Sequence, residues 1–306
     1  MDTTGNKKLI DLHTHLDTLD DLFLIRSKSQ NHLYKLEEHN IKGRKTILSV
    51  AIYTQFYQDH DKLIHIIKRL SARIDKLAGA TLIKNKADLR SDFQLGVILH
   101  LESAHTFVNY EKELDQIFKL GVRGIIPVHF YNNKIGKSCD DLTPSFLKNK
   151  SQQGLTQFGI DFIKACNQRS IWLDVSHCTD QTTIDIIANA DNVIASHIGM
   201  RELVSNKRNI PLSLIQKIIQ KDGLIGLIPW QHLIGKQANA YQEQINYAIE
   251  NNFVKNICIG SDFGSPIATH PKYRSIFDIE RTIENNPDIS DDMTWNNAYD
   301  FFSRCL

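Results

Sequence analysis

Histidine and carboxylate side chains cluster at the end of the first apolar segment of this chain. The segment "LIDLHTHLD" at positions 9–17 contains Asp11, His13, His15 and Asp17. Alternate residues of a β-strand point to the same side, so these four side chains would share one face if the strand extends that far. Two histidines at positions i and i+2 can then bind one cation, although such a pair also occurs on ordinary surface strands.

Residues of the same chemical type recur at the ends of later apolar segments. Imidazole nitrogens and carboxylate oxygens are suitable ligands for Zn²⁺ and similar divalent ions. A single histidine in a strand is more often a core or loop residue, but repetition at the same end of six segments is difficult to attribute to chance. The residues are His13, His15, Glu102, His129, His177, His197 and Asp262.

This set is large enough to hold one or two divalent metal ions, with zinc as the expected ion and a carboxylate to bridge two of them. A two-metal site lowers the pKa of a bridging water and stabilises the attacking and leaving atoms. A nearby carboxylate can accept the proton of that water and deliver it to the leaving group. The chain has no G-x-G-x-x-G after a strand segment and no phosphate-binding loop, so metal-assisted hydrolysis is favoured over redox chemistry.

The segments that carry these residues alternate with helical stretches, such as 59–78 and 211–223, whereas 18–45 is poorly periodic and is expected to be partly loop. Eight such units predict an α/β fold, a (β/α)₈ TIM barrel formed by residues 1–306 as a single domain, rather than an open doubly wound sheet. A barrel would place the site at the C-terminal ends of its strands. The predicted strands are 8–15, 46–54, 95–103, 123–130, 171–177, 193–198, 224–230 and 257–263.

The overall composition is that of an ordinary globular protein. Lys plus Arg is 36 and Asp plus Glu is 35, and this balance does not favour a nucleic-acid partner. No apolar run has the length of a membrane span, and the beginning of the chain lacks the apolar core of a signal peptide. The five cysteines form no C-x-x-C motif. We therefore expect a reduced, cytoplasmic protein whose cysteines are mostly small core residues, with no membrane association.

Several of these segments, taken in order from about residue 9 to 264, resemble the membrane (renal) dipeptidase family of amidohydrolase-like metal barrels. "HLESAH" is similar to the Glu-Gly-Gly-His segment of that family, and "LGVRGIIPVHFYNN" resembles its strand-four motif. The resemblance implies a metallopeptidase that hydrolyses dipeptides or dipeptide-like substrates through a metal-bound hydroxide, and it favours a homodimer. The remaining similar segments are "GLTQFGIDFIKACNQRSIWLDVSHCTDQT", "VIASHIGMREL" followed by "KRNIP", and "IGSDF".

The resemblance also implies which residues bind the metal ions. His13 and Glu102 would hold the first ion, with Glu102 bridging, and His177 and His197 would hold the second. His15 occupies a position where the family usually has Asp. A neutral imidazole in place of an anion raises the formal charge of the site by one, which leaves the metal type and the metal count open.

Residues that contact the substrate are implied in the same way. His129 would face the scissile carbonyl or the tetrahedral oxyanion, Arg208 would bind the C-terminal carboxylate of the substrate, and Asp262 would transfer protons. A guanidinium group fits a carboxylate through two parallel hydrogen bonds. By sequence alone Arg208 also fits an exposed turn. Trp230 falls where the family often has an aromatic residue lining the pocket, but it equally fits the core or rim.

Two alternative functions remain open at this stage. The opening "LIDLHTHLD" also resembles the start of TatD-type metal nucleases, which would cleave phosphodiesters in a basic groove. A catalytically impaired barrel that only binds a ligand is the second alternative. Asp262 argues against this second possibility, whereas the replacement at His15 leaves it open.

Overall fold

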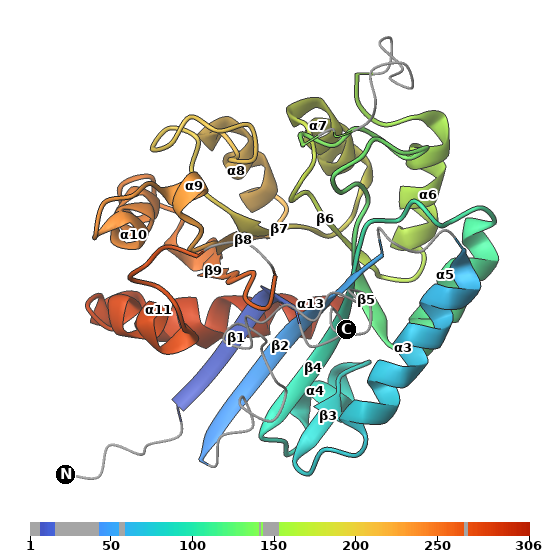
Figure 1. Cartoon of the computed structure of the whole chain (residues 1–306), viewed down its shortest axis with the longest axis horizontal. Helices are drawn as coiled ribbons and strands as arrows, with labels where there is room; N and C mark the ends of the chain where they lie inside the picture. Colours follow the sequence, from blue (N-terminus) through green and yellow to red (C-terminus); the bar gives the residue numbers. More distant parts are fainter. Residues whose placement is uncertain (1–6, 16–42, 55–58, 141, 143–152, 266–268) are drawn as a thin grey trace.

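Parallel strands form a closed ring at the centre of the molecule, surrounded by helices (Figure 1). The computed structural model describes residues 7–15, 43–54, 59–140, 142, 153–265 and 269–306, so Asp17 and nearly all of segment 18–45 lie outside the described residues. Strand β2 pairs with β1 on one side and β4 on the other, which closes a ring of eight strands and confirms the predicted TIM barrel. The strands are β1 (Lys7–Thr14), β2 (Arg44–Tyr53), β3 (Ala80–Leu82), β4 (Leu95–Glu102), β5 (Val122–Ile126), β6 (Trp172–Asp174), β7 (Val193–Ile198), β8 (Leu224–Leu227) and β9 (Ile257–Ile259).

Strand β3 is an addition to the ring that the sequence did not predict. It pairs only with the beginning of β4, from Ala80 opposite Leu95 to Leu82 opposite Val97. Strand β5 pairs with the second half of β4, starting at Leu99. Strand β3 therefore extends the sheet at one end without interrupting the closed barrel.

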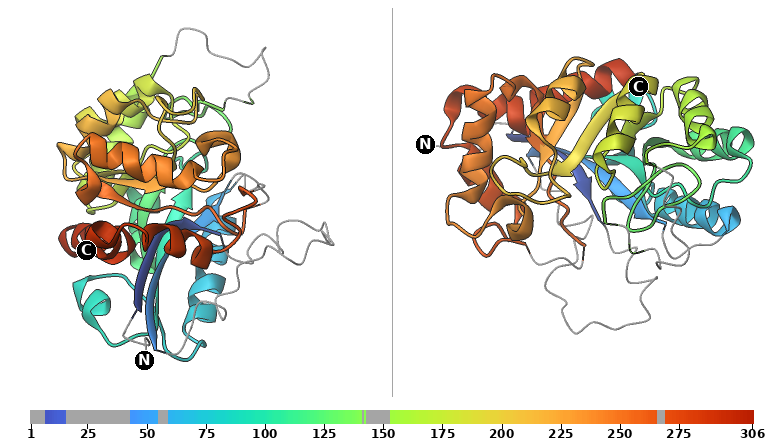
Figure 2. Two further views of the ribbon diagram at one scale, coloured as in Figure 1. Left: turned by 90° about the vertical axis from the view of Figure 1, so that its left-hand side faces the viewer. Right: turned by 90° about the horizontal axis from the view of Figure 1, so that it is seen from above.

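Helices cover the outside of the barrel (Figure 2). The predicted helix at 59–78 is observed as a shorter helix, α3 (His60–Ile74), capped by the Asp59 carboxylate, which accepts from the Lys62 N–H at 2.8 Å. The helix predicted at 211–223 is also shorter, because α8 spans Leu212–Ile219. The other helices are α4 (Lys86–Arg90), α5 (Tyr110–Leu120), α6 (Gln157–Asn167), α7 (Asp180–Asn189), α9 (Gln231–Ile234), α10 (Ala240–Glu250), η2 (Val254–Asn256), α11 (Ile276–Ile283), α12 (Pro287–Asp291), the π-helical segment η3 (Asp292–Asn296) and α13 (Asn297–Cys305).

The last helix, α13, packs across the N-terminal end of the barrel. The ring of Trp172, the first residue of β6, lies 5.8 Å from Phe301 and 5.5 Å from Phe302. Apolar residues from the first halves of the other strands, such as Ile10 and Ile98, complete this buried cluster. The N-terminal end of the barrel is thus a packed apolar core, and polar side chains gather at the C-terminal end.

Four of the predicted strands end three or four residues earlier than expected, namely 123–130, 171–177, 224–230 and 257–263. His129, His177 and Asp262 were predicted inside strands, but each lies three positions beyond the last strand residue, which is Ile126, Asp174 and Ile259 respectively. His177 and Asp262 have φ angles of 68° and 53°. This left-handed conformation turns the chain sharply after the strand.

Two further expectations concern the membrane and the cysteines. Among the described residues, no helix combines the length and the apolar character that are required to cross a bilayer. All five cysteines are free thiols, and four of them, Cys166, Cys178, Cys258 and Cys305, are buried as expected.

Candidate metal centre

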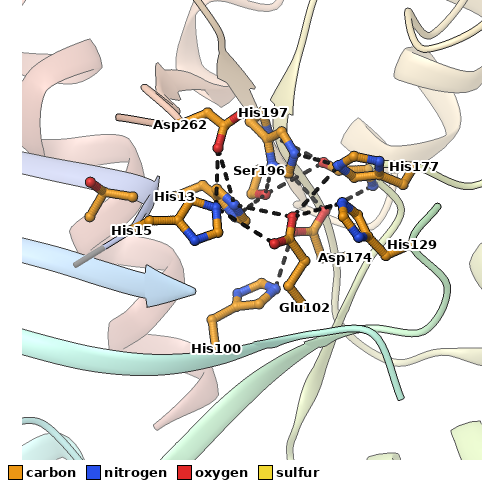
Figure 3. Close-up of polar contacts among 12 residues, drawn as sticks. His13, His15, His100, Glu102, His129, Asp174, His177, Ser196, His197 and Asp262 are labelled. Carbon is orange, nitrogen blue, oxygen red and sulfur yellow. Dashed lines mark hydrogen bonds and ion pairs between the residues drawn. The ribbon is translucent and has the colours of Figure 1, made fainter. Parts of the chain in front are cut away.

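The carboxylate of Glu102, at the C-terminal end of β4, lies among four histidine side chains (Figure 3). Its Oε1 atom is 3.6 Å from His13 Nε2, 3.4 Å from His129 Nε2 and 3.6 Å from His177 Nε2. Its Oε2 atom is 3.5 Å from His15 Nε2. All of these side chains are at most 5% exposed. The structure therefore brings together residues that are up to 164 positions apart in the sequence (13 to 177).

Asp262 and His197 complete this cluster. The Oδ1 atom of Asp262 is 3.2 Å from His15 Nε2 and 3.8 Å from His13 Nε2. On the other side, His197 Nε2 is 3.0 Å from His177 Nε2. All seven of the His and carboxylate residues singled out from the sequence thus lie at the same end of the barrel, as predicted.

The donor atoms of this cluster fit one or two divalent cations. His13 Nε2 is buried and has no hydrogen-bond partner within the described part of the chain. Burial is the main cause that lowers the pKa values of His13, His177 and His197, so these imidazoles are neutral and keep a lone pair. Burial also raises the pKa of Glu102 to about 7, because its charge is removed from water. A cation at this point would stabilise the buried carboxylate and use the free lone pairs.

The Nδ1 atoms of three of these histidines, His13, His177 and His197, have protein partners. His177 Nδ1 is 2.7 Å from the carboxylate of Asp140, and Ser196 Oγ is 3.3 Å from His13 Nδ1 and 2.8 Å from His197 Nδ1. If each Nδ1 carries the proton, its Nε2 lone pair points into the cluster. Neither Asp140 nor Ser196 was predicted from the sequence. For Ser196 a signal existed, because it directly precedes His197.

A second buried carboxylate supports the strands below the cluster. Asp174 at the end of β6 accepts from the N–H groups of Ser176 and Ser196, both at 3.0 Å, and lies 3.2 Å from His100 Nε2. Burial alone would raise the pKa of Asp174, but the adjacent His100 imidazole and the hydrogen bonds from Ser196 and Ser176 outweigh burial and lower the pKa. Asp174 therefore joins β6 to β7 close to His177, which follows β6, and to His197, which lies within β7.

Asp11 does not belong to the cluster, and the expectation that it shares a face with His13 and His15 was wrong. Its carboxylate accepts from the N–H of Ser261 at 2.9 Å and from the Ser261 hydroxyl. The pairing of β1 with β2 shifts register between Asp11 and Thr14, which breaks the alternation of side chains. Asp11 thus ties β1 to the end of β9.

Comparison with known proteins assigns the chain to a family. The sequence model of the membrane dipeptidase family, peptidase family M19, matches residues 6–298. The chain belongs to the membrane dipeptidase family. Dipeptidase 3 of Rattus norvegicus is 25% identical over 236 residues, which cover 71% of this chain and 46% of the rat protein. An uncharacterized protein of Acinetobacter calcoaceticus is 27% identical over 48% of this chain and 46% of its own length. The chain thus spans about half the length of these curated relatives.

Solved structures share the fold of this dipeptidase-family chain. A metallopeptidase of family M19, dipeptidase AC, superposes with a TM-score of 0.82 at 17% identity, covering 98% of this chain and 99% of the other. A metallopeptidase from Rhodobacter sphaeroides, solved with a phosphinate mimic of the dipeptide L-Ala-D-Ala, gives a TM-score of 0.78 at 18% identity and covers 99% and 100%. The barrel is therefore the one found in metallopeptidases of this family.

Arg208 lies beside the cluster, as the resemblance to the dipeptidase family predicted. It is 6% exposed, and its Nη2 atom is 3.1 Å from His177 Nε2. Its Nη1 atom is buried without a hydrogen-bond partner among the described residues. The exposed turn that the sequence alone also allowed is excluded. Trp230, by contrast, precedes α9 as a half-buried residue next to His232 (5.4 Å between rings), and these contacts do not join it to the cluster.

His15 is the residue for which the sequence resemblance predicted a departure from the family pattern. Burial would lower the pKa of His15, but the carboxylates of Glu102 and Asp262 outweigh burial and raise it. Its Nε2 atom points to both carboxylates, whereas its Nδ1 atom has no partner within the described part of the chain. His15 therefore faces the two carboxylates but lacks a hydrogen bond at Nδ1 like those of His13, His177 and His197.

Replacement of His15 by alanine tests this position. If His15 contributes a ligand, His15→Ala should lower the number of bound metal ions by up to one per chain, measured by elemental analysis after dialysis. His60→Ala is the control, because His60 bonds to Gln116 of α5. A variant with the full metal content and wild-type activity would show that His15 does not bind the metal.

Proposed function

We propose that this protein is a metal-dependent dipeptidase that hydrolyses the amide bond of dipeptides or closely similar substrates. The observation that carries the proposal is the buried guanidinium of Arg208, which adjoins the cluster through His177 and has one nitrogen without a partner. An anionic group on the substrate would satisfy that nitrogen. Membership of the dipeptidase family and the dipeptide mimic bound by the Rhodobacter sphaeroides structure support this choice of substrate.

We further propose that the centre holds zinc, in one or two ions. His13 and Glu102, with His15, would hold the first ion, and His177 and His197 the second, with Glu102 between them. Ions at this site would polarise the scissile carbonyl and lower the pKa of water. Imidazole and carboxylate donors suit zinc. The donor atoms of His13, His15 and Glu102 lie close enough together to hold one ion, and those of Glu102, His129 and His177 form a second group of this kind.

The protein side chains would then divide the remaining tasks. Arg208 orients the substrate by its C-terminal carboxylate. The imidazole of His129, neutral because burial lowers its pKa, faces the reacting carbonyl and donates a hydrogen bond to the developing oxyanion. Asp262 accepts the proton of the attacking water and transfers it to the leaving amine. Trp230 would line the rim of the substrate pocket.

Other features remain predictions. We propose that residues 1–306 act as a single hydrolase domain; the homodimer and the cytoplasmic location stay predictions from the sequence. The TatD-type nuclease alternative is not supported, because the chain belongs to a different family. A barrel without turnover would bind dipeptides without cleaving them. A hydrolysis assay on the metal-loaded protein distinguishes such a barrel from an active dipeptidase.

Arg208→Ala tests the substrate assignment. Loss of a charge-assisted hydrogen bond costs about 1.5–3 kcal/mol, so kcat/KM for free-acid dipeptides should fall roughly ten- to a hundredfold or more at unchanged metal content. Dipeptides with an amidated C-terminus should be poor substrates of the wild type and much less affected by the substitution. Arg169→Ala is the matched control, because Arg169 pairs with Glu111 and Asp115 of α5. Wild-type kcat/KM in the Arg208 variant would refute the role of Arg208 in binding the C-terminal carboxylate of the substrate.

A further inference from the structure

One carboxylate outside the metal cluster contacts both His177 and Arg208. The Oδ2 atom of Asp140 is 2.7 Å from His177 Nδ1 and 3.6 Å from Arg208 Nε. The side chain of Asp140 is 18% exposed, and those of His177 and Arg208 are 5% exposed. Neither the sequence patterns nor the family resemblance singled out Asp140.

The segment that carries Asp140 is attached to the end of β6. The N–H of Cys139 donates to the His177 carbonyl at 2.8 Å, and Ser138 forms a β-bridge with Cys178. The N–H of Asp140 donates to Ser138 Oγ at 3.2 Å, which holds the carboxylate in its turn. The position of Asp140 relative to His177 is therefore set by the backbone on both sides of the contact.

Asp140 also connects to the loop that carries Arg208. Lys207 Nζ donates to the Asp140 carbonyl at 3.2 Å, next to the contact between Arg208 Nε and the carboxylate. Because Asp140 meets the Nε side of the guanidinium, Nη1 remains without a protein partner within the described ranges, and Nη2 is directed to His177. One carboxylate thus determines how the imidazole and the guanidinium are oriented toward each other.

We infer that Asp140 is a positioning residue that couples metal binding at His177 to substrate binding at Arg208. It accepts the Nδ1 proton of His177, which leaves Nε2 for the metal, and it holds Arg208 with Nη1 free for an anionic group. The part that concerns Arg208 rests on the proposed dipeptidase function, whereas the part that concerns His177 does not. A simpler role, neutralisation of a buried Arg208 charge, would leave metal affinity unchanged.

The test separates these two contacts with two substitutions. In Asp140→Ala, metal affinity measured by competition with a chelator should fall about 10- to 100-fold, as for loss of a partner behind a ligating histidine. KM for free-acid dipeptides should rise roughly tenfold, with a smaller change for amidated dipeptides. Asp140→Asn keeps an acceptor for His177 but loses the charge, so its metal affinity should stay near the wild type while KM still rises. The asparagine variant also covers the case in which the alanine variant fails to fold.

A double-mutant cycle shows whether Asp140 acts through Arg208. Asp140→Ala should raise KM in the wild type but not in an Arg208→Ala background, where the anchor is already missing. Asp161→Ala is the control, because Asp161 bonds to Gln157 and Lys164 on the surface of α6. Unchanged metal affinity and KM in Asp140→Ala, with dipeptidase activity intact, would overturn the inference and leave the proposed function standing. Reduced metal affinity in a protein that cleaves no dipeptide would refute the proposed function and support the contact with His177.

Discussion

Glu102→Gln is expected to lose most of its bound metal and to lower kcat by on the order of a thousandfold or more. Glu102 places its two oxygen atoms within 3.4–3.6 Å of four imidazole nitrogens. The amide has nearly the same shape but no negative charge to hold divalent cations. Bound divalent cations stabilise the transition state by several kcal/mol. Each 1.36 kcal/mol of lost stabilisation lowers the rate by a factor of ten. Elemental analysis after dialysis and steady-state kinetics measure the two effects.

A matched control separates this result from a general effect of charge. Glu284→Gln removes a carboxylate that pairs with Lys7 at the surface, and it should leave both metal content and kcat unchanged. The unfolding temperature of Glu102→Gln shows whether the barrel remains intact. A folded Glu102→Gln protein with full metal content and wild-type kcat would contradict the assignment of Glu102 as the bridging ligand.

Asp262→Asn should lower kcat by about 10²–10⁴-fold while the protein keeps its metal ions, because loss of a general acid–base group has this magnitude. The residue adopts a φ of 53°, and asparagine tolerates this left-handed region as well as aspartate does. The substitution therefore removes the proton acceptor without straining the turn. Single-turnover and steady-state rates on a dipeptide, with metal content measured in parallel, give the result.

Asp222 provides a control with the same backbone conformation. It also has a φ of 53°, but it lies in the exposed turn between α8 and β8. Asp222→Asn should retain wild-type kcat, so any loss in Asp262→Asn is due to the carboxylate and not to the turn. If Asp262→Asn turns over within a few-fold of wild type, proton transfer belongs to another group.

The barrel, and the end of it that carries the His and carboxylate cluster, were predictable because they depend on patterns that repeat along the chain. Apolar strands recur eight times, and parallel strands in a barrel end at the same face, so residues such as His13 and His197 could be placed together without coordinates. Arg208 could be placed only by resemblance, since a basic residue in a polar loop has no periodic signal.

Other features depend on contacts between distant segments, which no local pattern records. Strand β3 has three residues, too few for alternation to be detected. Asp11 looked like a fourth residue of the metal-binding face, but a register shift directs its carboxylate to Ser261. Asp140 is an ordinary polar residue in a loop until the fold brings it to His177. In each case the deciding partner lies far away in the sequence.

The hydroxyl of Ser196, which faces the Nδ1 atoms of both His13 and His197, has a consequence for the entropy of the centre. Each imidazole would otherwise have to be ordered separately, and fixing a side chain costs conformational entropy. A common acceptor makes the orientations of the two rings interdependent, so ordering one restricts the other. His13 and His197 are far apart in the sequence, yet the conformational freedom of each ring is limited by the other through a single oxygen atom.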